Sequence, residues 1–324
     1  MAKGKNRLIL RRNMLVVGFI LAVIFICGAT IWLVLGSFAT ERRDPFTDIP
    51  GVTVETLVEL EGDRAYPEAI TVGLDAYLYS GSFCTGELWR ISPGGELEIW
   101  LPSGSGINAA SGMAFAPDGT LYIVDRDDCD PRRSISKLKR VLSDKTVEDW
   151  GETGSEEILN GLAFDMNGVL YATETHHGQV RTYDENGASV IWWELPVEES
   201  LPTGITYDAE NNAILVADSR HGTIYRILID SDGSAGAVSV LFEDQDHALD
   251  GLTLDNEGNI IFTSFDNHEV VRLETNGKMT VLARDFREPS DVAYLDGRIY
   301  VTNFDGVSLA PVISLIIDPA LPFS

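Results

Sequence analysis

The chain has 324 residues and carries 50 acidic against 24 basic side chains, a formal net charge of −26 at pH 7. So acidic a surface repels nucleic acid and anionic membrane surfaces, which excludes binding to either through charge. The length suits one large domain with appended segments.

The first 51 residues predict a membrane anchor followed by a connecting segment. Residues 14–35 contain no charged side chain, and as a helix they would cross a hydrocarbon core of roughly 30 Å. Residues 1–13 form a basic tail without acids, so the positive-inside rule predicts a cytoplasmic N-terminus, a single pass through the cell membrane and an extracytoplasmic remainder. Residues 36–51 are expected to be a tether. A cleaved signal peptide is the alternative, although its apolar stretch usually runs only about 7–15 residues.

Beyond the tether, one phrase occurs six times: an apolar strand, a turn with Gly, and a second strand that ends in acidic or small polar residues. Successive copies are 44, 49, 43, 47 and 40 residues apart. A unit of this length made of short strands cannot bury both faces of its sheet alone, which is typical of a β-propeller. We therefore predict an all-β, six-bladed propeller over residues 52–324. The copies begin PEAITV (67–72), SGMAFAPDG (111–119), NGLAFDMNG (160–168), TGITYDAEN (203–211), DGLTLDNEG (250–258) and SDVAYLDG (290–297).

Each repeat predicts four strands, except that the last one ends before a fourth strand is complete. The missing strand is expected at the other end of the chain, because VTVETLVEL (52–60) resembles the outermost strands of the other repeats. The two chain ends would then share one blade and close the ring without an open sheet edge.

Two cysteines, Cys84 and Cys129, occupy matching points of the first two repeats. Neighbouring repeats and an oxidising compartment predict a disulfide between them. A pair of free buried thiols is the alternative.

The first positions of the six inner strands converge on the propeller axis, because the repeat makes them equivalent by rotation. Glu68, Asn160 and Asp250 are three such positions and offer two carboxylates and a carboxamide oxygen. Oxygen ligands of this kind suit a hard divalent cation, most readily calcium. The alternative is that Asn-Gly and Asp-Gly simply form turns here.

The five histidines map to the same face of the predicted propeller. His247 precedes Asp250 by three residues, and imidazole titrates near neutral pH, so His247 is a candidate for general acid–base chemistry. The other interpretation is that a His-Gly turn, visible as HHG and RHG, was copied with the repeat.

The phrases LNGLAFDMNGVLYATE and LDGLTLDNEGNIIFTSF resemble repeats of the SMP-30/gluconolactonase/LRE-like family, with strictosidine-synthase-like and NHL-type propellers as relatives. The resemblance implies a central divalent metal held by Glu68, Asn160 and Asp250. The fourth blade places Thr203 where the family has Asn, and a hydroxyl is the weaker ligand. Blade one also begins YPEA instead of the usual Glu-Gly-Pro.

Three hypotheses of function follow. The first is a membrane-tethered lactonase or esterase that needs a divalent metal bound by Glu68, Asn160, Thr203 and Asp250, with Asp250 or His247 assisting proton transfer on a small-molecule substrate. The alternative is a non-catalytic NHL-type propeller that binds a ligand or a protein through the same face. A third hypothesis is a metal-free lyase or synthase that relies on Glu68 alone.

Overall fold

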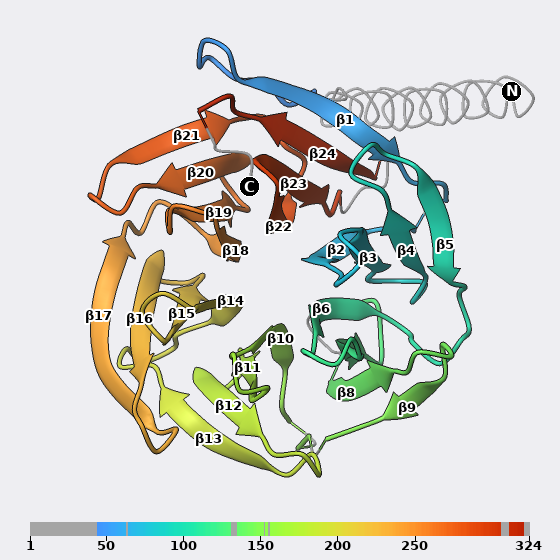
Figure 1. The fold of residues 1–324 in the computed structure, drawn as a ribbon, viewed down its shortest axis with the longest axis vertical. Coiled ribbons are helices and arrows are strands. Elements are labelled where there is room, and N and C mark those ends of the chain that lie inside the picture. The colour runs from blue at the N-terminus through green and yellow to red at the C-terminus, as the bar shows by residue number, and fades with distance from the viewer. Residues whose placement is uncertain are drawn as a thin grey trace, which may run out of the picture. The chain divides into compact units, whose positions relative to one another are not determined.

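The computed structural model describes residues 44–62, 64–130, 135–151, 153–154, 156–305 and 311–320, and all structural statements concern these residues. They form six four-stranded antiparallel sheets set radially around one axis, as Figure 1 shows. The predicted six-bladed all-β propeller is therefore confirmed. The predicted basic tail 1–13 and membrane helix 14–35 lie outside the described residues. Within the described part of the chain, no helix is long and apolar enough to cross a membrane.

Five blades are made of four consecutive strands each, numbered from the axis outward. Blades 1 and 2 contain β2 (Pro67–Val72), β3 (Leu78–Ser82), β4 (Leu88–Ile91), β5 (Leu97–Leu101), β6 (Ala110–Phe115), β7 (Leu121–Arg126), β8 (Ser136–Val141) and β9 (Val147–Asp149). Blades 3 to 5 contain β10 (Leu159–Phe164), β11 (Leu170–Glu174), β12 (Gln179–Tyr183), β13 (Ser189–Glu194), β14 (Pro202–Asp208), β15 (Ala213–Asp218), β16 (Thr223–Ile229), β17 (Ala235–Glu243), β18 (Leu249–Leu254), β19 (Ile260–Ser264), β20 (Glu269–Leu273) and β21 (Met279–Ala283).

Blade 6 joins the two ends of the described chain. Its inner strands are β22 (Pro289–Leu295), β23 (Arg298–Asn303) and β24 (Val312–Ile317), and its outermost strand is β1 (Thr53–Glu59). β1 runs antiparallel to β24, with Thr53 opposite Ile317. The closure predicted from residues 52–60 is thus present, and it spares the ring an open edge.

Part of the predicted tether contacts the propeller. Phe46 and Arg284 exchange two backbone hydrogen bonds, of 3.0 and 2.8 Å. The Arg284 guanidinium also lies 3.4 Å from the Asp48 carboxylate. The single bridge at Phe46 therefore extends the pairing of blade 5 by one residue pair.

The core lies between neighbouring blades, because each second strand is apolar on both faces. All six residues of β15 (AILVAD) are buried, and Val216 packs with Tyr171 of blade 3 on one side. The alternate residue Leu215 packs with Leu252 of blade 5 on the other side. Such continuous apolar runs are what a sheet covered on both faces requires.

Tight Asx turns connect the first and second strands. The Asp165 carboxylate accepts the N–H groups of Asn167 and Val169, each at 2.9 Å. Asp255 does the same for Glu257 and Asn259. In blades 3 and 5 the Asp-x-x-Gly phrase thus folds the hairpin at the end of the channel where the inner strands finish.

Glycines allow the inner strands to approach one another near the axis. A Cβ atom on Gly112 would lie 1.9 Å from the carbonyl oxygen of Asn160 in the next blade, and one on Gly204 would lie 2.3 Å from that of Asp250. Threonine hydroxyls reinforce the same seam. Thr173 accepts the Gly161 N–H at 2.8 Å and contacts the Thr203 carbonyl at 2.6 Å.

We expect Gly112→Ala to destabilise the propeller by about 1–3 kcal/mol, since the added methyl group would force two backbones apart. Gly94→Ala is the matched control, because a Cβ there has no contact closer than 3.8 Å. Urea denaturation of both variants measures the difference. Equal stabilities would contradict the close approach of the inner strands.

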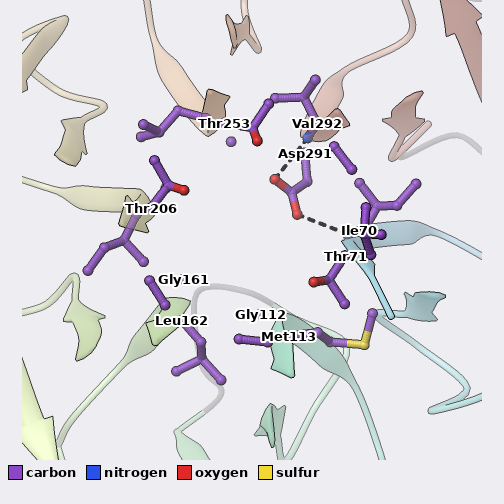
Figure 2. Close-up of a pocket in the computed structure, with 18 of the residues that line it drawn as sticks. Ile70, Thr71, Gly112, Met113, Gly161, Leu162, Thr206, Thr253, Asp291 and Val292 are labelled. Carbon is purple, nitrogen blue, oxygen red and sulfur yellow. Dashed lines mark hydrogen bonds between the residues drawn. The ribbon is translucent and has the colours of Figure 1, made fainter. Parts of the chain in front are cut away.

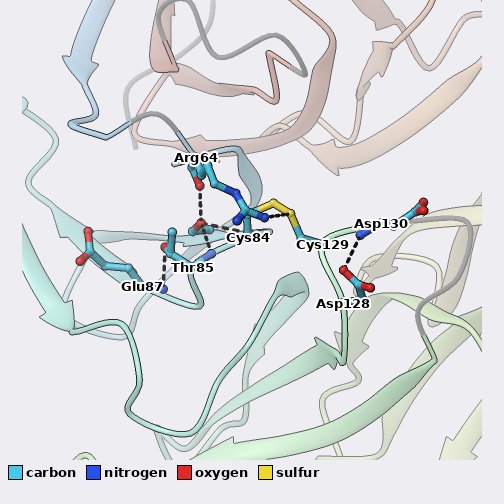
Figure 3. Close-up of a disulfide and its surroundings, with 8 residues drawn as sticks. Arg64, Cys84, Thr85, Glu87, Asp128, Cys129 and Asp130 are labelled. Carbon is cyan, nitrogen blue, oxygen red and sulfur yellow. Dashed lines mark hydrogen bonds between the residues drawn. A yellow bond between two sulfur atoms is a disulfide. The ribbon is translucent and has the colours of Figure 1, made fainter.

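The loops that follow β3 and β7 are joined by a disulfide between Cys84 and Cys129 (Figure 3), the pair that the sequence predicted. The Cα atoms are 4.7 Å apart. The Arg64 guanidinium lies 2.7 Å from the Cys129 sulfur. The cross-link fastens blade 1 to blade 2 on the face where the inner strands begin.

Candidate functional site

A cavity of about 430 Å³ runs along the axis and is lined by the inner strands of all six blades (Figure 2). Glu68, Asn160 and Asp250 all line it, as do Ser111 and Ser290. Five of the six first positions therefore meet, as rotation of the repeat predicts. Farther along, the hydroxyls of Thr71, Thr206 and Thr253 point toward the channel.

Thr203, the sixth of these positions and the fourth expected metal ligand, is not among the lining residues. Its hydroxyl lies 3.1 Å from the carbonyl oxygen of Leu249 and 3.3 Å from that of Asp250, so it bonds to the backbone of blade 5. The second strand of blade 4 has Ala217 where blade 3 has Thr173, and Thr203 supplies the inter-blade hydrogen bond instead. Of the four expected ligands, Glu68, Asn160 and Asp250 therefore line the channel.

His247 also lies away from the channel lining. Its side chain is buried against Phe242 and Phe262, and its Nδ1 atom is 2.9 Å from the Ser264 hydroxyl. The imidazole thus fastens its loop to β19. This position gives no support to the expected role of His247 in proton transfer, because the ring contacts Ser264 and Phe262 of blade 5 and Phe242 of blade 4.

The acids at the ends of second strands brace the loops on the same face. Asp125 accepts the N–H groups of Asn108 and Ala109, at 2.7 and 2.9 Å. Glu174 and Asp218 each hold a histidine Nδ1 at 2.9 Å, from His177 and His221 respectively. These buried carboxylates and their His-Gly turns are repeated structural devices, and their oxygens are already engaged.

The structure adds one residue that the sequence reasoning missed. Asp291 of blade 6 stands where blades 2 to 5 have Gly, and it lines the channel. Its carboxylate accepts the N–H groups of Ile70 in blade 1 and of Val292, at 2.9 and 2.8 Å, drawn as dashed lines in Figure 2. The signal was present in the phrase SDVAY, in which Asp replaces the repeated Gly.

Burial raises the pKa of all three carboxylates in the channel, and neighbouring negative charge adds to the rise for two of them. Burial and then the charge of Asp291 raise the pKa of Glu68 to about 8. Burial also raises the pKa of Asp291 to about 7, although two backbone N–H groups oppose that rise. The pKa of Asp250 lies well above its ordinary value, because of burial and then the charge of Glu68. The site therefore holds protons, or another positive charge, near neutral pH.

The channel offers oxygen donors of the kind that a divalent cation requires. Glu68, Asn160 and Asp250 provide oxygen atoms only, the preference of calcium. Within the described residues no three His, Cys, Asp or Glu side chains lie close enough together to hold a metal by themselves. Asn160 and further carbonyl or water oxygens would have to complete such a site. The carboxylates fit a cation, since positive charge would offset their mutual repulsion. The Thr203 hydroxyl does not fit this site, because it is hydrogen-bonded to the backbone of blade 5.

The fold and the axial channel define a six-bladed propeller with an acidic central site. Residues 198–303 match the family model described as SMP-30/Gluconolactonase/LRE-like region, which confirms the resemblance seen in the repeat phrases. No curated protein sequence matches the chain.

Solved structures of several kinds share the architecture. A gluconolactonase from Xanthomonas campestris is 13% identical over 85% of this chain and 95% of its own, with a TM-score of 0.66. A luciferin-regenerating enzyme is 14% identical over 85% and 98%, with a TM-score of 0.65. Virginiamycin B lyase from Staphylococcus aureus is 13% identical over 82% and 99%, with a TM-score of 0.62. At these identities the likeness establishes the fold alone.

Proposed function

We propose that this protein is a hydrolase of the lactonase or esterase type, which acts on a small molecule in the axial channel with a divalent cation, preferably calcium. The observation that carries the proposal is the convergence of Glu68, Asn160 and Asp250 on one channel, from blades 1, 3 and 5. The match of residues 198–303 to the gluconolactonase family region supports the same chemistry.

Each channel residue has a distinct task in this proposal. Glu68 and Asp250 hold the cation through carboxylate oxygens, and Asn160 adds its carboxamide oxygen. A bound cation would polarise an ester carbonyl and lower the pKa of water. Asp250 is also the candidate to accept a proton from that water. Asp291 holds Ile70 in place, which fixes the wall beside Glu68.

We also propose that the propeller works outside the cytoplasm, attached to the membrane by residues 14–35. The support is the uncharged stretch itself and the disulfide Cys84–Cys129, since disulfides persist in oxidising compartments. Fractionation of cells that express the full chain, with protease added from outside, tests the topology.

A panel of lactones and aryl esters, assayed with the purified full chain, tests the activity. We expect turnover in the presence of calcium, its loss with a chelator and its recovery when calcium is restored. Calcium binding without turnover of any substrate would favour the binding-propeller alternative. The binding alternative has a structural relative. An auxiliary nutrient binding protein from Bacteroides ovatus shares the fold, with a TM-score of 0.64, 14% identity and coverage of 82% of this chain and 76% of that one.

A further inference from the structure

Six equivalent residues at the ends of the second strands encircle the axis where the inner strands begin. The backbone N–H of each bonds to the loop that leads into the inner strand of the same blade, at 2.8–3.0 Å. The partner carbonyl in that loop lies two residues before Glu68 or its equivalent, so the ring adjoins the acidic end of the channel. We name this set the mouth ring: Phe83, Arg126, Thr175, Ser219, Phe265 and Phe304.

One half of the mouth ring is aromatic. The rings of Phe83 and Phe304 are 5.6 Å apart, and those of Phe265 and Phe304 are 6.4 Å apart. Tyr66 stacks on Phe304 at 5.4 Å. These residues belong to blades 1, 5 and 6, the blades that carry Glu68, Asp250 and Asp291. An apolar wall thus stands beside the acidic end of the channel.

Arg126 faces the same side from blade 2. Its guanidinium carbon lies 5.9 Å from the centre of the Phe83 ring, and the residue is only 5% exposed. Among the described residues, its Nε and Nη1 atoms have no hydrogen-bond partner. Its charge acts on Glu68, which places the guanidinium near the acidic end. Buried donors without a partner are costly, and a ligand oxygen would remove that cost.

The backbone of Tyr66 is strained at this point. Its φ is +35°, a conformation that a bulky side chain rarely adopts. The Phe83 N–H bonds to the Tyr66 carbonyl at 2.9 Å, which holds the ring of Tyr66 against Phe304. Strain of this kind persists where the surroundings fix it, often beside a ligand site.

We infer that the mouth ring binds the substrate, and that this substrate is an apolar, aryl- or alkyl-bearing carbonyl compound in place of a polyhydroxylated sugar lactone. Arg126 donates to the carbonyl or ring oxygen, and the half-buried rings of Phe265 and Phe304 cover the hydrocarbon part. The inference deepens the proposed function and rests on it only for the bond that reacts. Arg126 is a binding and specificity residue here.

Binding of a γ-lactam that carries a phenyl substituent tests the inference without any turnover, because the amide resists hydrolysis. Calorimetry of the full chain is expected to give an affinity at least about tenfold higher than for the unsubstituted γ-lactam, from burial of the phenyl ring. Arg126→Gln is expected to weaken phenyl-lactam binding about tenfold or more, through loss of a charged donor. Phe304→Leu should reduce the preference for the phenyl compound while leaving the Arg126 contact.

Arg140→Gln is the matched control, since Arg140 pairs with Glu148 on the outer strands of the same blade. Melting temperatures establish that each variant is folded, and Phe304→Leu keeps the test decisive if Arg126→Gln does not fold. Equal binding of the two lactams, or binding unchanged in both mouth-ring variants, would overturn the inference. Phenyl-lactam binding that depends on Arg126, in a protein that hydrolyses no lactone, would uphold the mouth ring and refute the hydrolase.

Discussion

Asp250→Asn is expected to lower calcium affinity at least about 100-fold and to abolish calcium-dependent turnover. Replacement of groups that only orient metal ligands typically costs about 10–100-fold in affinity, so loss of a ligand charge should cost at least as much. The substitution keeps the size of the side chain, and the raised pKa of Asp250 means that little stability is lost with the charge. Calorimetric titration with calcium, alongside the lactone assay, measures both effects.

Asp118→Asn provides the control for this experiment. Asp118 is an exposed turn residue whose carboxylate accepts the Thr120 N–H at 2.9 Å, a contact that a carboxamide oxygen also makes. The calcium affinity and turnover of the Asp118→Asn variant should equal those of the unaltered protein. An unchanged calcium affinity in Asp250→Asn would contradict a role of Asp250 as a calcium ligand.

Glu68→Gln is expected to stabilise the calcium-free protein, and the gain should grow as the pH rises from about 5 to 8. Folding raises the pKa of the Glu68 carboxylate from its ordinary 4.5 to about 8. In this range the folded state therefore binds more protons than the unfolded state, and the contribution of Glu68 to stability falls with rising pH. A single unit of that shift corresponds to about 1.4 kcal/mol. Glutamine carries no charge to desolvate, so the stability of Glu68→Gln does not fall with rising pH in this way.

The measurement is the difference in melting temperature between Glu68→Gln and the unaltered chain, taken in chelator at several pH values. Glu55→Gln, an exposed position on β1, controls for loss of one surface charge and should show no such trend. Calcium should reverse the order at pH 8, because the cation stabilises only the protein that retains both carboxylates. A difference that does not vary with pH would contradict the desolvation of Glu68.

Repetition made most of the fold predictable. Spacing gave six blades, the apolar character of residues 52–60 gave the closing strand, and matching positions gave the disulfide Cys84–Cys129. The same rotation argument predicted correctly that Glu68, Asn160 and Asp250 reach one channel. Each of these conclusions depends only on which residues are equivalent.

The positions of Thr203, His247 and Asp291 depend on the direction of single side chains, which the repeat does not determine. Thr203 is equivalent to Asp250, yet its hydroxyl turns to the backbone of blade 5 in place of a threonine that blade 4 lacks on its second strand. His247 precedes Asp250 closely in sequence, but it packs against Ser264 and Phe262 of its own blade and Phe242 of blade 4, away from the channel lining. Asp291 was missed because it is equivalent to the glycines of blades 2 to 5 and not to Glu68, yet its side chain lines the channel. Contacts with residues distant in the sequence decide these cases, and no local pattern reveals them.

The most direct measurement is a crystal structure of the protein with terbium in place of calcium, located by its anomalous signal. We expect one strong peak on the propeller axis, about 2.3–2.6 Å from oxygens of Glu68, Asn160 and Asp250. A peak confined to another acidic segment, such as Asp127–Asp130, or an axis without any bound ion at saturating concentration, would contradict a metal-dependent chemistry in the channel.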